Sequence, residues 1–403
     1  MPDVKYKPMK PKLPKEEPWV QVKYFNFSQT IYPNMIQEVS GRIEAGSLVN
    51  VYDPNGDFFG TGFFNDPARM PLRVIKHGGT LMTEDDLDAR ILGAAKFRRN
   101  LLKLDEVTNA YRVIHGNGDN LSGLIVDRYE DTLVFHVGSL PVQQRLNRWI
   151  PMLHEVLGTS QTHIELDSSA PREEGLKRPT ETIRKKIKIR ENGVNFEVDF
   201  TEGHKTGFFC DQRDNRKRLT QLTEGKKVLD LCCYTGGFSV YAATLGKAES
   251  VIGVDLDERA IAQAKRNANI NGISPKKIKF THADAFSYTR QMQRNGEQFD
   301  VVIADPPKFV AHRHGELADK GRQRYNDLNQ LASSLVAPGG ILVTYSCSGL
   351  LPVPEFEKIV IGGAHKSKRK MQIFEYTGPG LDHPTYSNAP ESRYLKAIWA
   401  RLF

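Results

Sequence analysis

The chain has 403 residues and a mass of 45.5 kDa, and 39% of its residues are hydrophobic and 26% charged. This length and composition predict two or three domains with buried cores and exclude a chain that is disordered throughout. The 56 basic residues outnumber the 48 acidic ones, and the net charge of +8 permits nucleic-acid binding without establishing it.

The sequence contains neither a signal for membrane insertion or secretion nor a cysteine pattern typical of zinc sites or disulfide frameworks. No stretch approaches about 18 consecutive apolar residues, so we expect no membrane span. The N-terminus carries charge and proline in place of an apolar core, so we expect no secretion signal. The four cysteines (Cys210, Cys232, Cys233 and Cys347) lack both zinc-binding and disulfide-framework spacing. The sequence therefore predicts a cytoplasmic protein without a bound metal, whose thiols are available for chemistry.

The first part of the chain divides into a tail and a β-rich module. Residues 1–22 are rich in lysine and proline and are expected to form a flexible basic tail, either a solvated extension or an arm that contacts RNA. Residues 23–83 are predicted to form a small β-rich domain. Its strands are expected at 48–52, 58–64 and 72–75, with a turn at 53–57.

Residues 84–190 are predicted to form a small α+β domain. The expected helices are 84–104 and 141–157, the expected strands are 110–114, 123–126, 132–137 and 162–166, and a turn is expected at 127–131. A turn is expected at 191–193, between strands at 187–190 and 194–200. A basic run at 177–190 marks the end of this domain. It forms either an RNA-binding surface or an exposed strand pair, and the sequence does not decide between them.

Strand–helix alternation characterises the last domain, residues 191–403. The expected strands are 228–231, 251–255, 278–282, 299–304 and 341–345, and the expected helices are 237–245, 257–271, 284–295, 322–336 and 353–361. This alternation predicts an α/β domain with an open, mostly parallel sheet and helices on both faces.

Acidic residues stand at or just after the ends of successive strands in this domain. Asp230 and Asp255 end the first two strands, and Asp284 and Asp305 follow the next two. The carboxyl ends of parallel strands meet at one edge of the sheet, where such sheets bind ligands. Asp255 is placed to accept ribose hydroxyls and Asp284 to meet an adenine amino group. Four acids in this order predict one ligand site.

A turn of small residues follows Asp230 and opens a helix. It contains Tyr234, Thr235, Gly236 and Gly237. Glycine permits close approach of the backbone to a ligand, and a helix N-terminus supplies unpaired N–H groups. The G-x-G-x-x-G pattern of dinucleotide sites is missing here, which argues against a dehydrogenase.

These motifs resemble those of class I S-adenosylmethionine-dependent methyltransferases. Asp305-Pro306-Pro307-Lys308-Phe309 with Tyr345-Ser346-Cys347-Ser348 resembles, more specifically, the large-subunit rRNA cytosine-C5 methyltransferases that carry an N-terminal PUA domain. Segments 121–129, 203–216 and 391–397 resemble the central domain, a cofactor-flanking signature and the final strand of that family. The resemblance implies a Rossmann-like domain with a mostly parallel seven-stranded sheet, preceded by a PUA-like domain and a small α+β domain. It also implies S-adenosylmethionine as cofactor and large-subunit rRNA as partner.

The resemblance assigns catalytic roles to the two motifs. In such an enzyme a cysteine thiolate adds to carbon 6 of cytosine, which lets carbon 5 attack the methyl group. Cys347 is the candidate nucleophile, and the alternative is a buried packing cysteine. Asp305 is expected to hold the edge of the base. Pro306-Pro307 directs the loop, Lys308 meets phosphate or Asp305, and Phe309 stacks on a base that has left its helix.

The resemblance also extends the expected cofactor site. Gln212 and Arg213 lie near the cofactor, and the arginine is expected to pair with its carboxylate. The full expected set is Gln212, Arg213, Asp230, Tyr234, Thr235, Gly236, Gly237, Asp255, Asp284 and Asp305.

Two other functions stay open at this point. A guanine N-methyltransferase on the same fold would need no nucleophilic thiol, so Cys347 discriminates between it and a cytosine enzyme. A non-catalytic RNA-binding assembly factor would not need the complete set of motifs. The oligomeric state is also open, with a homodimer as one candidate.

Overall fold

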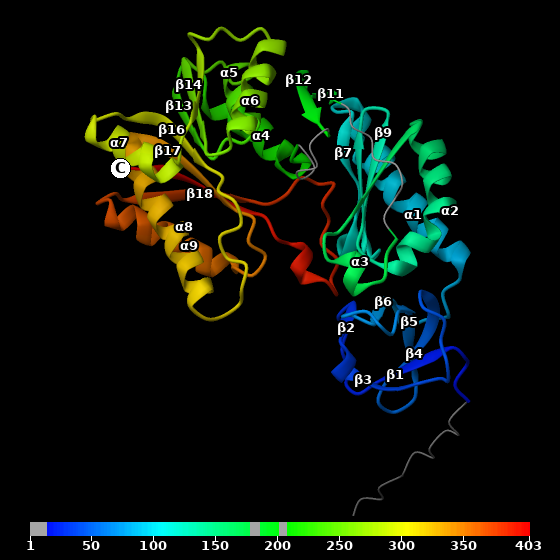
Figure 1. Cartoon of the computed structure of the whole chain (residues 1–403). Coiled ribbons are helices and arrows are strands. Elements are labelled where there is room, and N and C mark those ends of the chain that lie inside the picture. The colour runs from blue at the N-terminus through cyan, green and yellow to red at the C-terminus, as the bar shows by residue number, and fades with distance from the viewer. Residues whose placement is uncertain (1–13, 178–185, 201–207) are drawn as a thin grey trace, which may run out of the picture.

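The computed structural model describes residues 14–177, 186–200 and 208–403. They form a β-rich domain, an α+β domain and an α/β domain in chain order, and the α+β domain lies between the other two (Figure 1). Parts of three segments from the sequence analysis lie outside the described residues. They are 1–13 of the expected tail, 178–185 of the basic run and 203–207 of the cofactor-flanking signature.

The first domain is a six-stranded sheet in the order β2-β6-β5-β4-β1-β3. The strands are β1 (Trp19–Val22), β2 (Thr30–Ile31), β3 (Ile36–Val39), β4 (Ser47–Tyr52), β5 (Phe58–Phe64) and β6 (Leu72–His77). Val20 and Val22 of β1 pack against Val49 and Val51 of β4 in the core. The expectation of a tail is therefore wrong for residues 19–22, because pairing with β3 and β4 decides the conformation of this short segment.

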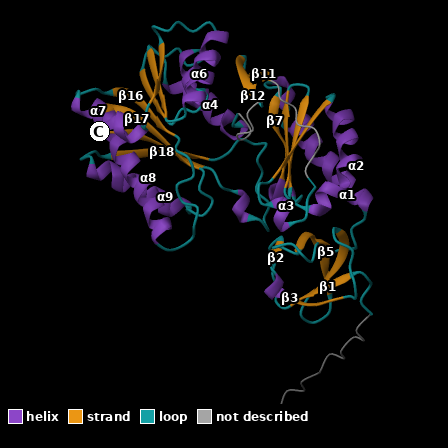
Figure 2. Cartoon of the chain, in the orientation of Figure 1, coloured by secondary structure: helices purple, strands orange, loops and turns teal. Residues whose placement is uncertain are grey.

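The α+β domain is a four-stranded sheet in the order β10-β9-β8-β7. Its elements are α1 (Glu84–Lys96), β7 (Ala110–His115), β8 (Leu124–Tyr129), β9 (Thr132–Val137), α2 (Leu140–Leu157), β10 (Gln161–Leu166) and α3 (Ala170–Glu173). Helices α1 and α2 lie side by side on one side of the sheet (Figure 2). Leu87 and Ile91 of α1 and Trp149 and Leu153 of α2 belong to the shared core.

Two local expectations in this domain are wrong. The α-helix expected over 84–104 ends at Lys96 and continues as a π-helical turn over Phe97–Leu101. The turn expected at 127–131 starts only after Tyr129, because Asp127 is buried within β8 and pairs with Arg112 on β7 at 2.5 Å. The tertiary ion pair overrides the local turn preference of the aspartate.

A β-hairpin connects the α+β domain to the α/β domain. Its strands are β11 (Lys186–Glu191) and β12 (Val194–Asp199), which pair antiparallel. The backbone N–H of Asn109 donates to the Arg190 carbonyl, and the backbone N–H of Glu197 donates to Asn267 Oδ1. The hairpin therefore contacts both neighbours, and the domain boundary expected between residues 190 and 191 wrongly divides it.

The last domain is a seven-stranded sheet in the order β15-β14-β13-β16-β17-β19-β18. The first five are parallel, and β19 runs antiparallel to both of its neighbours. The strands are β13 (Lys227–Leu231), β14 (Ser250–Asp255), β15 (Ile278–His282), β16 (Phe299–Ala304), β17 (Val336–Ser346), β18 (Met371–Thr377) and β19 (Lys396–Leu402). The expected Rossmann-like α/β fold with a mostly parallel seven-stranded sheet is confirmed.

Helices cover both faces of this sheet and bury separate apolar clusters. They are α4 (Arg213–Leu219), α5 (Gly237–Ala243), α6 (Glu258–Ile270), α7 (Ala285–Arg294), α8 (Glu316–Leu335) and α9 (Val353–Lys366). One cluster includes Phe238 and Trp399, and another includes Leu328 and Leu342. Segment 391–397, expected to form the final strand, is a 3-10 turn and a loop until Lys396. Within the described ranges, no helix is long and apolar enough to cross a membrane.

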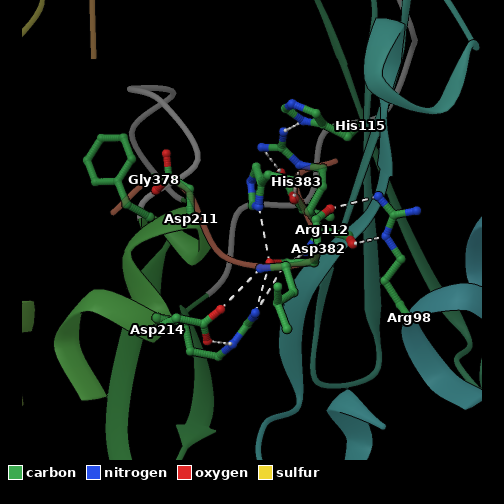
Figure 3. Close-up of polar contacts among 12 residues, drawn as sticks. Arg98, Arg112, His115, Asp211, Asp214, Gly378, Asp382 and His383 are labelled. Carbon is green, nitrogen blue, oxygen red and sulfur yellow. Dashed lines mark hydrogen bonds and ion pairs between the residues drawn. The ribbon is translucent and has the colours of Figure 1, made fainter. Parts of the chain in front are cut away.

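Asp382, in the segment between β18 and β19, connects the α+β and α/β domains. Its carboxylate accepts the guanidinium of Arg213 on α4 at 2.8 and 3.1 Å and the backbone N–H of Arg112 on β7 at 2.9 Å. Its carbonyl accepts Arg98 Nη2 at 2.7 Å (Figure 3). Burial acts to raise the pKa of Asp382, but His383 and Arg213 hold it well below its ordinary value. A buried, ionised carboxylate thus joins two domains.

The variant Asp382→Asn should lower the free energy of unfolding by about 3–5 kcal/mol, because the buried Arg213 then loses its counter-charge. Since the pKa of Asp382 is depressed, this stabilisation is present above the ordinary Asp pKa of about 4 and is lost as the pH falls below it. Urea unfolding at neutral pH measures the change. Glu224→Gln, which breaks an exposed ion pair with Lys247, is the control and should have little effect. An unchanged midpoint in D382N would contradict this role.

Candidate functional site

Two carboxylates hold the turn between β13 and α5. Asp230, which is fully buried, accepts the N–H and the hydroxyl of Ser239 at 3.0 and 2.6 Å. Asp255, at the end of β14, accepts the backbone N–H of Tyr234 at 2.8 Å. Gly236 has a φ of +79°, and a Cβ there would come within 3.0 Å of two neighbouring side chains. The turn is therefore fixed before any ligand binds, and only glycine fits its last position.

A cavity of about 610 Å³ lies at the carboxyl ends of β14, β13, β16 and β17 and extends to the α+β domain. This volume is in the range typical of small-molecule sites. The expected site residues that line it are Gln212, Tyr234, Thr235, Gly237, Asp255, Asp305, Pro306, Pro307, Lys308 and Cys347. The fold thus brings together side chains from five separate segments of the chain.

Other expected site residues lie outside this wall: Arg213, Asp230, Gly236, Asp284 and Phe309. Arg213 pairs with Asp382, so its guanidinium is engaged at the domain junction. Asp284 caps α7 by accepting the N–H of Ser287 at 2.9 Å. Phe309 packs against the ring of Tyr325, with ring centroids 4.9 Å apart. The carboxylate contact expected of Arg213 and the base stacking expected of Phe309 therefore do not match where these side chains lie.

Asp305 is a carboxyl group in crowded, poorly solvated surroundings. Burial and the nearby carboxylates of Asp211 and Asp230 raise the pKa of Asp305 to about 8, although Gln212 Nε2 donates to its Oδ2 at 3.0 Å. At pH 7 the group is therefore mostly protonated. A protonated carboxyl can donate a hydrogen bond as well as accept one.

Cys347 follows β17 directly and is half-buried. Its Sγ lies 4.0 Å from the carbonyl oxygen of Pro306, on the loop that begins with Asp305. Cys210, Cys232 and Cys233 also line the cavity, and burial raises the pKa of each of these thiols well above its ordinary value. Those three are poor candidates for a thiolate nucleophile.

The cavity wall also contains side chains that the sequence analysis does not single out. They include Arg112, Asp127, Tyr129, Phe208, Phe209, Asp211, Arg216, Asp257, His383 and Tyr394. Asp211 Oδ2 accepts the Tyr394 hydroxyl, while the buried Oδ1 has no hydrogen-bond partner in the described structure. Asp211 and Tyr394 fall within segments that resemble the methyltransferase family, which was a usable signal. Asp127 falls within segment 121–129, which carries the same signal. Arg112 lies outside these segments, and only domain packing brings it to the cavity.

Comparison with known proteins identifies the family. A family model described as S-adenosylmethionine-dependent methyltransferase matches residues 170–355, and one described as PUA-like domain matches residues 18–77. Over 377 residues the chain is 36% identical to ribosomal RNA large subunit methyltransferase I of Aliivibrio fischeri, covering 92% of this chain and 94% of that protein. The chain belongs to the ribosomal RNA large subunit methyltransferase I family. The member from Photobacterium profundum is 35% identical, with 91% and 94% of the two chains covered.

Solved structures share the fold of this family member. A methyltransferase structure complexed with SAH gives a TM-score of 0.76 at 22% identity, over 89% of this chain and 92% of that one. A SAM-dependent methyltransferase from Streptococcus mutans gives 0.74 at 22% identity, over 90% and 93%. This likeness concerns the fold alone. The expected family, fold class and S-adenosylmethionine dependence are confirmed, whereas the roles of single residues stay predictions.

The raised pKa of Asp305 predicts a stability that depends on pH. Between the ordinary Asp pKa of about 4 and the folded-state value of about 8, the folded protein holds a proton that the unfolded chain has lost. Stability should therefore fall as the pH rises through this window. Asp305→Asn should remove the part of this pH dependence that Asp305 causes. At pH 8 the variant should be more stable than the wild type by about 2 kcal/mol or more, with little difference near pH 4. Some pH dependence stays in the variant, because burial also raises the pKa of Asp230, to about 7.

Urea unfolding of wild type and D305N at several pH values checks this prediction. The exposed Asp66→Asn is the matched control and should leave the pH dependence as it is. Parallel curves for wild type and D305N across the window would show that Asp305 is ionised in the folded protein.

Proposed function

We propose that this protein transfers a methyl group from S-adenosylmethionine to carbon 5 of a cytosine in large-subunit ribosomal RNA, through a covalent adduct with Cys347. The names of relatives that match over nearly their whole length support the RNA substrate. The observation that carries the chemistry is the placement of Cys347 and Asp305 in one cavity wall, at the ends of the neighbouring strands β17 and β16.

The polar groups of the cavity fit S-adenosylmethionine. Asp255 and Asp257 place carboxylates at the end of β14, which suits the two hydroxyls of a ribose. The buried, unpartnered Oδ1 of Asp211 is an acceptor that suits the ammonium group of the methionine part. The rings of Tyr234 and Phe209, whose centroids are 5.2 Å apart, supply an apolar surface for the ligand beside these carboxylates. When bound, S-adenosylmethionine supplies an electrophilic methyl group.

The two catalytic residues address the weak nucleophilicity of carbon 5. The Cys347 thiolate forms a bond to carbon 6, and the electron pair of the 5,6 double bond shifts into the ring. Ring nitrogen 3 gains negative charge in this step, and the protonated carboxyl of Asp305 donates a hydrogen bond to it. Carbon 5 is now an enamine carbon and attacks the methyl group. The bond between that methyl and the sulfonium sulfur breaks, and its electron pair leaves with the sulfur as a neutral thioether. Loss of the proton on carbon 5 then restores the double bond and expels the thiolate.

The base must leave its stack to reach this cavity. Lys308 is exposed beside Pro307, where it can contact a phosphate of the same strand. Phe209 replaces Phe309 as the proposed stacking side chain, since it lines the cavity and is 40% exposed. Arg112 and Asp127 form the far wall, so the α+β domain also borders the substrate.

We place the reaction in the cytoplasm, where a reducing environment keeps the Cys347 thiol available. A homodimer remains a prediction of the sequence.

Cys347→Ala should abolish formation of 5-methylcytosine, a loss of about 10⁴-fold or more, because no other group supplies the covalent adduct. The assay uses labelled S-adenosylmethionine and protein-free large-subunit rRNA, with mass analysis of the nucleosides. Cys232→Ala, which changes another cavity cysteine with a raised pKa, is the matched control and should keep most of the activity.

Methylated guanine as the product, with C347A still active, would contradict the proposal and assign Cys347 to packing. If protein-free rRNA gives no product, the same assay is repeated on ribosomal particles. An enzyme that needs the assembled particle would form 5-methylcytosine there, whereas an enzyme with another activity would not.

A further inference from the structure

A buried lysine lies behind the turn that carries Cys347. Lys396, the first residue of β19, pairs in register with Ser346 at the end of β17 and is 6% exposed. Its Nζ donates to the carbonyl oxygens of Ser348 and Leu351, each at 2.6 Å. Both carbonyls belong to the turn after Cys347. The ammonium group therefore holds this turn from the side of the sheet.

Hydroxyl groups hold the same turn from the helix side. The hydroxyl of Tyr325, on α8, lies 2.9 Å from Ser348 Oγ and accepts Ser346 Oγ at 3.0 Å. Ser348 Oγ in turn accepts the backbone N–H of Val310 at 3.2 Å. Both neighbours of Cys347 are thus fixed by uncharged groups, and Lys396 adds a formal positive charge to the same turn.

Burying the Lys396 ammonium group without a carboxylate partner costs free energy, which suggests that the charge has a function. Lysine is almost never fully buried without a partner of opposite charge. Among the ion pairs of the described residues, none joins Lys396 to a carboxylate, and its hydrogen bonds go to neutral carbonyls. Burial lowers the pKa of Lys396 to about 8, while a negative charge on Cys347 acts in the opposite direction. At pH 7 the group is still mostly protonated, so a buried cation is bound to the turn that begins with the Cys347 thiol.

We propose that Lys396 is a positioning residue for the nucleophile: its ammonium group fixes the turn at 346–351 and favours the thiolate form of Cys347. The role in catalysis rests on the proposed function, whereas the effect on the thiol can be measured without RNA. A nearby positive charge stabilises a thiolate relative to the thiol, and only the thiolate is nucleophilic.

The other titratable groups around Cys347 do not supply this charge. Burial raises the pKa of Tyr325 on α8, so its hydroxyl is neutral at pH 7. Asp305, after β16, is mostly protonated at that pH. Lys308, in the same cavity wall, is exposed, and solvent screens its charge. Arg112 and Arg216 also line the cavity, but their guanidinium groups pair with the carboxylates of Asp127 and Glu191. Lys396, on β19, is a buried cation that binds the turn of Cys347 and has no carboxylate partner among the described residues.

The test measures the rate at which iodoacetamide alkylates each cysteine of the full-length protein between about pH 6 and pH 9, resolved by peptide mass. Lys396→Gln keeps an amide N–H donor for the two carbonyls but removes the charge, and Lys396→Arg keeps the charge. Lys227→Met is the matched control, because Lys227 is also the first residue of a strand but is exposed. Cys210, Cys232 and Cys233 are internal references with raised pKa values.

We expect the alkylation rate of Cys347 at pH 7 to fall about tenfold in K396Q, the change that one pKa unit produces. K396R and K227M should keep the wild-type pH profile. The same profile for K396Q and wild type would overturn the proposal and leave Lys396 as a support of the turn alone.

Failure of this inference is distinguishable from failure of the proposed function. A shifted alkylation profile in K396Q without any 5-methylcytosine from the wild type would overturn the proposed reaction but support the link between Lys396 and Cys347. Formation of 5-methylcytosine with an unshifted profile would overturn only the role of Lys396.

Discussion

The buried carboxylate of Asp382 is the contact on which the geometry of the cavity depends. It binds Arg213 of the α/β domain and the backbone of Arg112 in the α+β domain. Arg112 lines the cavity, and so does His383, the residue that follows Asp382 in the chain. The far wall of the site is therefore positioned by an ion pair whose partners are about 170 residues apart in sequence. Both domains must be docked before the cavity has its shape, so substrate binding and domain docking are physically linked.

Ionisable groups that are shielded from water dominate the chemistry of the site. Crowding and burial raise the pKa of Asp305 to about 8, and burial lowers that of Lys396 to about 8. Each shift costs stability, because burial makes the charged form of the group less stable than it is in water. Such costs are typical of functional sites, where an unstable arrangement is retained for its reactivity. Here they yield a carboxyl that can donate a hydrogen bond and a cation beside the thiol.

The parallel strands were the most predictable part of the fold. Strands β15 and β16 have the bounds expected from the sequence, because buried parallel strands are short apolar runs that end at polar turns. Strands at the edges of the sheets were harder to predict. The sequence analysis does not predict β18, whose residues alternate between half-buried and exposed at the edge of the sheet. Strand β1 depends on partners that are distant in the chain. The β11–β12 hairpin, in contrast, matches the two strands expected at 187–190 and 194–200 to within one residue at each end.

The sequence by itself determined the order of the domains, the Rossmann-like sheet and the strand-end motifs around Asp255, Asp305 and Cys347, because these follow from local apolar runs and the residues that end them. The tertiary structure decided which of the predicted residues line the cavity. Arg213 and Phe309 are turned away by an ion pair and by ring packing, whereas Asp211 and Arg112 are brought in. Side-chain direction and domain docking depend on contacts between distant residues, and no local pattern in the sequence encodes them.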